Sequence, residues 1–443
     1  MIIEGYSHFG ATERVAGALR NIMDHYGVLA PHTGEPFTEA LLMGIGGGLG
    51  AEYYVGIHKG IDLSRKAYNR LYLRFNHTRN YIQKQEDNYL PKTAARIGAH
   101  LTIKETVSQT IANQFLSESL QAGKPVIVKL SIWQGLHHHP AIQDRYKADP
   151  DVFSPLLYGE FINFLPYYTL PFPWITEHLI IVYGIDEEAE RVLLSDFSNQ
   201  PLTLSISQFI ESRSIMKKWK NLAYTINPPK TNPDLAKAIR LGINDCVESL
   251  LCEKSRGAST QIGTRAWRTM AVKVGDIQGK RGWVTLFNEP WQLFDSLTQM
   301  HAQIAFFNSD GGALRSSYAD FLEEASDILK KPELKHIAHQ FSDIGIIWDE
   351  IGTTALNDDV PELLHARQTA LDWHNTFKVH GSAKTNSLEA LSMELRGIRA
   401  QFSEKSPFTP RELLILFEEL SARLFEVYDA ETSALKALRL AMK

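Results

Sequence analysis

A histidine and an aspartate, His178 and Asp196, are the side chains whose types and placement best fit catalysis in this chain. An aspartate that accepts a hydrogen bond from one imidazole nitrogen leaves the other nitrogen to act as a general base. This is how the base is oriented in Ser–His–Asp and Cys–His–Asp sites. The alternative is a half-buried histidine and a turn aspartate, which the spacing alone does not exclude.

The segments that carry these two residues predict a β-hairpin. The apolar runs EHLIIVYGID, residues 177–186, and RVLLSDF, residues 191–197, are separated by the charged turn EEAE. The histidine opens one strand and the aspartate closes the next. Adjacent antiparallel strands can therefore place the two side chains beside each other.

The hydropathy pattern changes at NPPKTNP, residues 227–233, and divides the chain into two predicted domains. Residues 1–227 mix helical and strand-like patterns, which indicates an α+β domain. Residues 234–443 show helical periodicity with few β-branched runs, which indicates an all-helical domain. Helices are expected at 15–25, 101–121, 235–251, 291–307, 314–329, 337–351, 363–376, 387–402 and 411–439, and strands at 125–132, 179–183 and 192–194.

The composition is that of a soluble globular protein, with 443 residues, 44% hydrophobic and 22% charged. A net charge of −5 gives no basic field for a phosphate backbone, so we expect no nucleic-acid partner. No signal sequence and no run of about 18 apolar residues is evident, so we expect no membrane association. Two cysteines are too few for a disulfide framework, and a cytoplasmic location is expected.

Several segments resemble the N-terminal domain of the butirosin biosynthesis protein H family. They are GALRNIMDHYGV, LLMGIGGGLGAEYY, and EHLIIVYGIDEE with VLLSDFSNQPLTLS. In the second half, GGALRSSYADFLEEASDIL resembles the helical domain of uncharacterised function that commonly follows it. The resemblance implies a papain-like, cysteine-peptidase-like fold that is used for acyl transfer.

The same resemblance implies a chemistry and a set of partners. The butirosin protein moves an aminoacyl group from an acyl-carrier-protein thioester onto an amine of an aminoglycoside. Its site combines a cysteine at the N-terminus of the first helix with a histidine and an aspartate, matched here by His178 and Asp196. An acyl carrier protein or other thioester donor and a small-molecule acceptor are the implied partners, in natural-product biosynthesis and with no cofactor.

The chain departs from the family at the nucleophile. Where the family reads His-Cys shortly before the GALR helix, an ungapped count back from Gly17 gives Glu13 and Arg14. An arginine at a helix N-terminus is electrostatically disfavoured unless an anion offsets it. Arg14 is therefore a candidate to bind a ligand carboxylate or phosphate, together with Glu13. The alternative is a solvated helix-start charge paired with Glu13.

Other polar side chains near this position are weaker candidates. Ser7 and Thr12 are hydroxyls that could contact substrate or act as the nucleophile, and helix capping is the alternative for each. Cys246 and Cys252 lie on a presumed helix of the second domain and are expected in its core. The glycine run 44–50 lacks the lysine of a phosphate-binding loop and is interpreted as a structural loop beside the first helix.

A histidine run at 137–139 lies in residues 133–159, which look like an insertion relative to the family. Consecutive side chains of an extended segment point to opposite faces, so at most two of the three could meet one metal ion. A complete site would need a further ligand, such as His8 or His178. We assign no metal; the alternative is a polar loop over the site, with His138 and His8 as substrate contacts.

The sequence thus supports three classes of function. The first is an acyltransferase that forms an amide or ester, in which the acceptor attacks the thioester directly and His178, oriented by Asp196, is the base. The second is a non-catalytic or repurposed binding protein of the same fold. The third is a metal-dependent enzyme that uses the inserted histidines. The donor, the acceptor and assembly into a homo-oligomer stay open.

Overall fold

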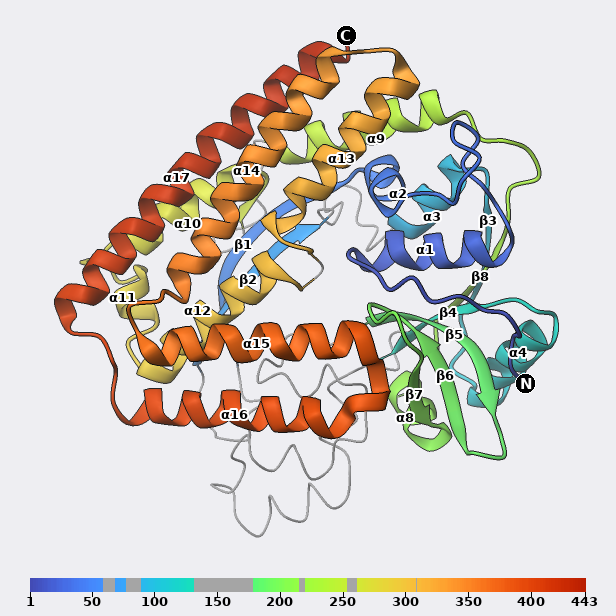
Figure 1. The fold of residues 1–443 in the computed structure, drawn as a ribbon, viewed down its shortest axis with the longest axis horizontal. Helices are drawn as coiled ribbons and strands as arrows, with labels where there is room; N and C mark the ends of the chain where they lie inside the picture. Colours follow the sequence, from blue (N-terminus) through green and yellow to red (C-terminus); the bar gives the residue numbers. More distant parts are fainter. Residues whose placement is uncertain (59–67, 77–88, 131–177, 215–219, 253–260, 308) are drawn as a thin grey trace.

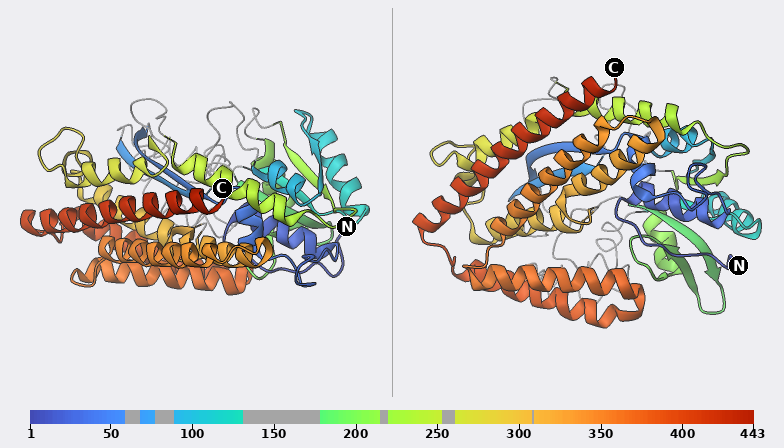
Figure 2. Two further views of the ribbon diagram at one scale, coloured as in Figure 1. Left: turned by 90° about the horizontal axis from the view of Figure 1, so that it is seen from above. Right: turned by 45° about the horizontal axis from the view of Figure 1, so that its top comes forward.

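The structure is a computed structural model, which describes residues 1–58, 68–76, 89–130, 178–214, 220–252, 261–307 and 309–443. Figure 1 shows a β-sheet with its flanking helices on the right and long helices on the left and below. A smaller sheet lies at the centre of that view. The two views of Figure 2 show that the molecule is flat in one direction.

The larger sheet has six strands, in the order β3–β8–β4–β5–β6–β7, and every neighbouring pair is antiparallel. The central strands β4 and β5 are mostly buried because residues of both faces are apolar. The strands are β3 (His100–Lys104), β4 (Val126–Leu130), β5 (His178–Asp186), β6 (Arg191–Ser195), β7 (Leu202–Ser205) and β8 (Ala223–Asn227). The helices of this part are α1 (Arg14–His25), α2 (Glu39–Gly46), α3 (Tyr89–Arg96), α4 (Gln109–Gln121) and α8 (Ile206–Ser214).

These elements confirm the predicted α+β class, and the predicted hairpin is the antiparallel pair β5–β6. The helix predicted at residues 101–121 is wrong in its first part, which forms strand β3. The physical reason is a helix start at Ser108, whose hydroxyl accepts a hydrogen bond from the Ile111 amide. The residues before this cap are free to pair with β8.

The second half is mostly helical, as predicted. Its long helices pack side by side, and α17 runs along one edge of the molecule in Figure 1. Its elements are α9 (Leu235–Leu250), β9 (Gln261–Ile262), α10 (Arg265–Gly275), α11 (Trp283–Leu286), α12 (Pro290–Ala305), η4 (Gly312–Leu314), α13 (Arg315–Leu329), α14 (Glu333–Ala355), α15 (Pro361–His380), η5 (Gly381–Lys384), α16 (Thr385–Glu404) and α17 (Pro410–Ala441).

A three-stranded sheet joins the two halves of the chain. It contains the hairpin β1 (Leu49–His58) and β2 (Tyr68–Asn76), and the short strand β9 pairs with β1. The Trp283 indole donates a hydrogen bond to the Tyr53 hydroxyl at 3.1 Å, so helix α11 also contacts the hairpin. The predicted boundary between residues 1–227 and 234–443 therefore lies within one sheet: β1 and β2 precede the boundary, and β9 follows it.

The glycine run forms the end of helix α2 rather than only a loop, and it allows helices to approach closely. A Cβ atom on Gly44 would lie 2.2 Å from the Phe321 ring of α13. A Cβ atom on Gly242 of α9 would lie 2.1 Å from the Gly44 carbonyl oxygen. Glycine is needed at both positions because any side chain would separate α2 from the helical half.

A buried ion pair ties the hairpin to the helical half. Arg315 and Glu431 are both fully buried, and Arg315 Nη2 lies 2.8 Å from Glu431 Oε1. The same guanidinium donates to the Gly50 carbonyl at 3.2 Å and lies over the rings of Trp267 and Trp348. A buried charge is tolerated here because it is paired, hydrogen-bonded and stacked on aromatic faces.

No helix among the described residues is both long and apolar enough to cross a membrane.

Candidate functional site

The pairing of β5 with β6 brings His178 and Asp196 together. Ser195, the last residue of β6, pairs with Ile181, so Asp196 comes level with Ile180 on the face of β5 that carries His178. A carboxylate oxygen of Asp196 contacts His178 Nε2. Both side chains are buried, with exposed fractions of 0% for His178 and 3% for Asp196. The predicted contact is therefore present, while its catalytic role stays a prediction.

Helix α1 begins beside this pair, within one residue of its predicted start. Arg14, its first residue, is half-buried, and its Nη1 atom lies 3.4 Å from His178 Nδ1. A guanidinium carries only N–H donors and no acceptor. Nδ1 must therefore accept, which places the imidazole proton on Nε2, where it is donated to Asp196. Arg14 thus occupies the side of the ring that would serve as the base.

Glu13 is the N-cap of helix α1, and its side chain is buried. Its carboxylate accepts hydrogen bonds from the amides of Val15 and Ala16, at 3.0 and 2.8 Å. The second oxygen accepts from the Asn76 side chain of β2 at 3.2 Å. Glu13 is only 1% exposed, so its carboxylate lies inside the fold. A carboxylate at this end also offsets the helix dipole.

A second carboxylate, that of Glu39 at the start of α2, lies beside this cap. It accepts a hydrogen bond from the Thr12 amide at 2.7 Å and also contacts the Glu13 amide. Burial and the neighbouring Glu13 carboxylate raise the pKa of Glu39 to about 7, although both amides and Arg20 oppose the shift. The backbone before α1 is therefore held by a group that titrates near neutral pH.

The remaining candidates of the N-terminal segment are Ser7, Thr12 and His8. Ser7 is exposed, and the N-cap of α1 is Glu13 rather than Ser7 or Thr12. His8 packs against the rings of Tyr6 and Tyr183, at 5.2 and 4.9 Å between centroids. Tyr183 is in the middle of β5, whereas His178 is at its start. Burial lowers the pKa of His8 to about 4, so His8 is neutral at pH 7.

The histidine run at 137–139, with His138, lies outside the described residues. Among the described residues, no group of three His, Cys, Asp or Glu side chains could hold a metal ion. Cys246 is buried in α9, as expected, and burial raises the pKa of its thiol to about 11. Cys252 is half-buried. Neither cysteine is near the start of α1 in the chain, and both belong to the second half.

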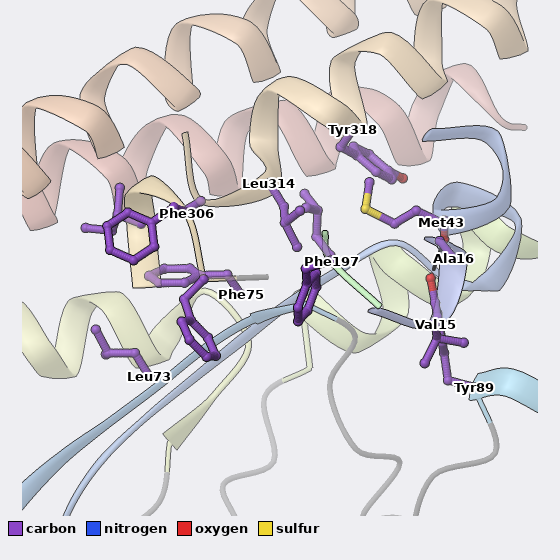
Figure 3. Close-up of a cluster of buried hydrophobic side chains, with 14 of the residues drawn as sticks. Val15, Ala16, Met43, Leu73, Phe75, Tyr89, Phe197, Phe306, Leu314 and Tyr318 are labelled. Carbon is purple, nitrogen blue, oxygen red and sulfur yellow. Dashed lines mark hydrogen bonds between the residues drawn. The ribbon is translucent and has the colours of Figure 1, made fainter. Parts of the chain in front are cut away.

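Phe197 connects the dyad with the hydrophobic core. Its ring centroid lies 5.9 Å from that of His178. Figure 3 shows Phe197 in a buried cluster with Val15 of α1, Phe75 of β2 and Leu314 of the helical half. The pattern of apolar residues in the sequence did not predict that Leu314 of the second half lies in the same cluster as Phe197.

The sequence analysis also missed the partners of α1. Asn76 is the last residue of a strand that was not predicted, and the Glu39 contact crosses a loop. The available signal was local: Thr38 precedes Glu39 as the N-cap of α2, with its hydroxyl accepting from the Leu41 amide at 3.0 Å. That pattern predicts the start of a helix, but it does not predict where the carboxylate of Glu39 lies.

Two family profiles match this chain. Residues 15–143 match the N-terminal domain described as butirosin biosynthesis protein H, and residues 210–370 match a domain of unknown function (DUF4872). Arg14, His178 and Asp196 lie outside both matched ranges. No curated protein matches the chain. The two domains, in this order and on an α+β region followed by a mostly helical one, place the chain in the butirosin biosynthesis protein H family, which is named for the biosynthesis of an antibiotic.

Proposed function

We propose that the chain catalyses acyl transfer from a thioester donor, such as an acyl carrier protein, to an amine or hydroxyl of a small molecule in natural-product biosynthesis. The observation that supports this proposal is the buried His178–Asp196 pair at the N-terminus of α1. A carboxylate on one imidazole nitrogen directs the other nitrogen, Nδ1, toward the reacting groups. No covalent enzyme intermediate is required.

In the proposed step, the acceptor nitrogen attacks the carbonyl carbon of the thioester, so that a C–N bond forms and the C–S bond breaks. His178 Nδ1 takes the proton of the amine and returns it to the leaving thiolate. The products are an amide and a free thiol. Arg14 must first leave Nδ1, because an atom that accepts from a guanidinium cannot accept a second proton in the same place.

The hydrogen bonds of the Glu13 and Glu39 carboxylates support a second role for Arg14 in the proposed reaction. The amides of Val15 and Ala16 already donate to Glu13, and the amide of Thr12 donates to Glu39. These donors are therefore not available to an oxyanion, although helix N-termini often provide them. In the proposed reaction, the Arg14 guanidinium, once displaced from His178, would stabilise the negative charge that develops on the thioester oxygen.

The proposal is tested with N-acetylcysteamine thioesters of small aminoacyl groups as donors and amino sugars as acceptors. Amide formation is followed by mass spectrometry and thiol release by colorimetry. His178→Gln removes the base but keeps a side-chain donor for Asp196, and it should lower kcat by about 100-fold or more. His25→Ala is the matched control, because His25 lies on α1 and its Nε2 contacts the Gly123 carbonyl, 2.9 Å away, rather than Asp196.

Equal turnover by the His178→Gln variant and the unaltered protein would contradict the proposal. So would an absence of turnover across the whole donor panel when a carrier-bound thioester is included. A loss of activity in His25→Ala comparable to that in His178→Gln would indicate that the fold of α1, and not the base, was affected.

The contact between Arg14 and His178 favours a second candidate, a binding protein that retains the family fold. A guanidinium at the family's nucleophile position is suited to a carboxylate or phosphate of a ligand. Isothermal titration calorimetry with inorganic phosphate and succinate distinguishes the two. Binding that is weakened about tenfold by Arg14→Gln, without turnover of any thioester, supports this candidate. Turnover supports the first.

A further inference from the structure

The loop that follows Asp196 is attached to the C-terminal end of helix α15. The Ser198 hydroxyl donates to the Lys378 carbonyl at 3.2 Å, and the Asn199 amide donates to the same oxygen at 2.8 Å. Lys378 is in the last turn of α15, where carbonyl groups lack partners within the helix. The loop therefore supplies hydrogen bonds that this helix end needs.

The attachment continues into the turn between α15 and α16. The Thr203 amide donates to the Ser382 hydroxyl at 3.1 Å. Gly381 has a φ of +52°, and a Cβ atom there would lie 3.0 Å from the Pro201 carbonyl oxygen and from the Ser198 hydroxyl. Backbone therefore lies directly against backbone, with no room for a side chain between them.

The opposite side of the same loop contacts the segment that leads into α1. The Ala11 amide donates to the Phe197 carbonyl at 3.4 Å. A Cβ atom on Gly10 would lie 2.3 Å from the Asn199 side-chain oxygen and 2.8 Å from the Phe197 oxygen. Residues 197–199 thus lie between the end of α15 and the backbone immediately before Arg14.

We propose that Ser198 is a positioning residue, through which helix α15 holds Asp196 and the start of α1 in register with His178. The catalytic use of this positioning rests on the proposed function, whereas the contacts themselves do not depend on that function. Ser198 is fully buried, and its hydroxyl both donates to Lys378 and accepts from the Gln200 amide at 3.1 Å. Removing the hydroxyl leaves the Gln200 amide without this acceptor and weakens the attachment of the loop.

The test measures how well the Nε2 proton of His178 is protected from exchange with water, by NMR of the full chain labelled with 15N-histidine. The proton is assigned by its loss in His178→Gln. Ser198→Ala should raise its exchange rate about tenfold, because the loop opens more often. Ser421→Ala is the matched control: its hydroxyl also donates to a carbonyl of another helix, that of Ala271 at 2.9 Å, away from the loop. It should leave the exchange rate unchanged.

An unchanged rate in Ser198→Ala overturns the proposal, as does an equal increase in both serine variants or a proton that is unprotected in the unaltered chain. If circular dichroism shows that Ser198→Ala is unfolded, Ser382→Ala takes its place, with a smaller increase of about threefold expected. Proton exchange needs no substrate. A protected, Ser198-dependent proton in a chain without acyl transfer would therefore refute the proposed function and leave the positioning role intact.

Discussion

Arg14 and Asp196 contact opposite nitrogen atoms of the same imidazole ring. Arg14 Nη1 lies 3.4 Å from His178 Nδ1, and the Asp196 carboxylate contacts Nε2. The ring thereby lies between a guanidinium group and a carboxyl group, one at each nitrogen atom. The resemblance matches the family's cysteine to Arg14, so in the proposed function the orientation of His178 would be kept while the group at its Nδ1 atom changes.

Replacement of His178 by alanine should destabilise the fold. It leaves the Asp196 carboxylate buried without its hydrogen-bond donor, and an unsatisfied buried acceptor of this kind costs about 1–3 kcal/mol. His178→Gln should cost less because the amide can still donate. Urea denaturation of both variants, of Asp196→Ala and of the double alanine variant measures the coupling between the residues. Additive losses would show that the contact does not stabilise the protein.

Arg14→Cys should restore a reactive thiol beside His178. The variant is made with Cys252 replaced by serine, while Cys246 is buried and stays unreactive. Alkylation by iodoacetamide at pH 7 should be about tenfold faster than in the same chain with His178→Gln. The carboxylates of Glu13 and Glu39 oppose the thiolate, so the imidazole must supply most of the effect. Equal alkylation rates with and without His178 would show that the thiol at position 14 does not contact the imidazole ring.

Glu39→Gln should alter how stability depends on pH. The pKa of Glu39 is raised from 4.5 to about 7 in the folded protein, so its protonated form is favoured by folding. The stability that this group contributes is complete below pH 4.5 and is lost as the pH rises to about 7. The variant should therefore gain stability relative to the unaltered chain between pH 5 and pH 8, by about 2–3 kcal/mol. Urea denaturation at both pH values measures the difference, and a difference independent of pH would contradict the raised pKa.

The buried pair of Arg315 and Glu431 should be more sensitive to the loss of one partner than to the loss of both. Glu431→Gln leaves the guanidinium without its counter-charge and should lower the free energy of unfolding by about 3 kcal/mol. The double change Arg315→Met with Glu431→Leu should recover part of that loss. Arg423→Gln is the control, since its partner Glu350 is exposed and such pairs contribute little. A double variant less stable than Glu431→Gln would refute this expectation.

The dyad could be predicted because it depends on short-range pairing. A four-residue turn joins β5 to β6 and keeps the two strands adjacent, but a register shift between Val182 and Gly184, and not alternation alone, brings Asp196 to the face of β5 that carries His178. Helix α1 was placed within one residue for a similar reason: its apolar periodicity is local. What the family resemblance added was the expectation that α1 begins next to that strand face.

Contacts between distant parts of the chain could not be predicted in this way. Asn76 is 63 positions from Glu13, and Lys378 is 180 positions from Ser198. Neither contact leaves a periodic signal in the sequence. The sequence did not identify Glu13 as the N-cap of α1, because glutamate is an uncommon N-cap and its capping here depends on the burial that Asn76 and the backbone near Glu39 provide.

The pairing of β9 with β1 bears on how this chain can be divided. A fragment that ends after residue 227 would lose β9, helix α10 and the indole of Trp283, and would expose buried side chains of the hairpin such as Tyr53, Leu71 and Phe75. A hairpin with an apolar face and an open edge is a template for aggregation. We therefore expect the two regions that match separate family profiles to fold as one unit, so that expression or exchange between relatives would have to keep both together.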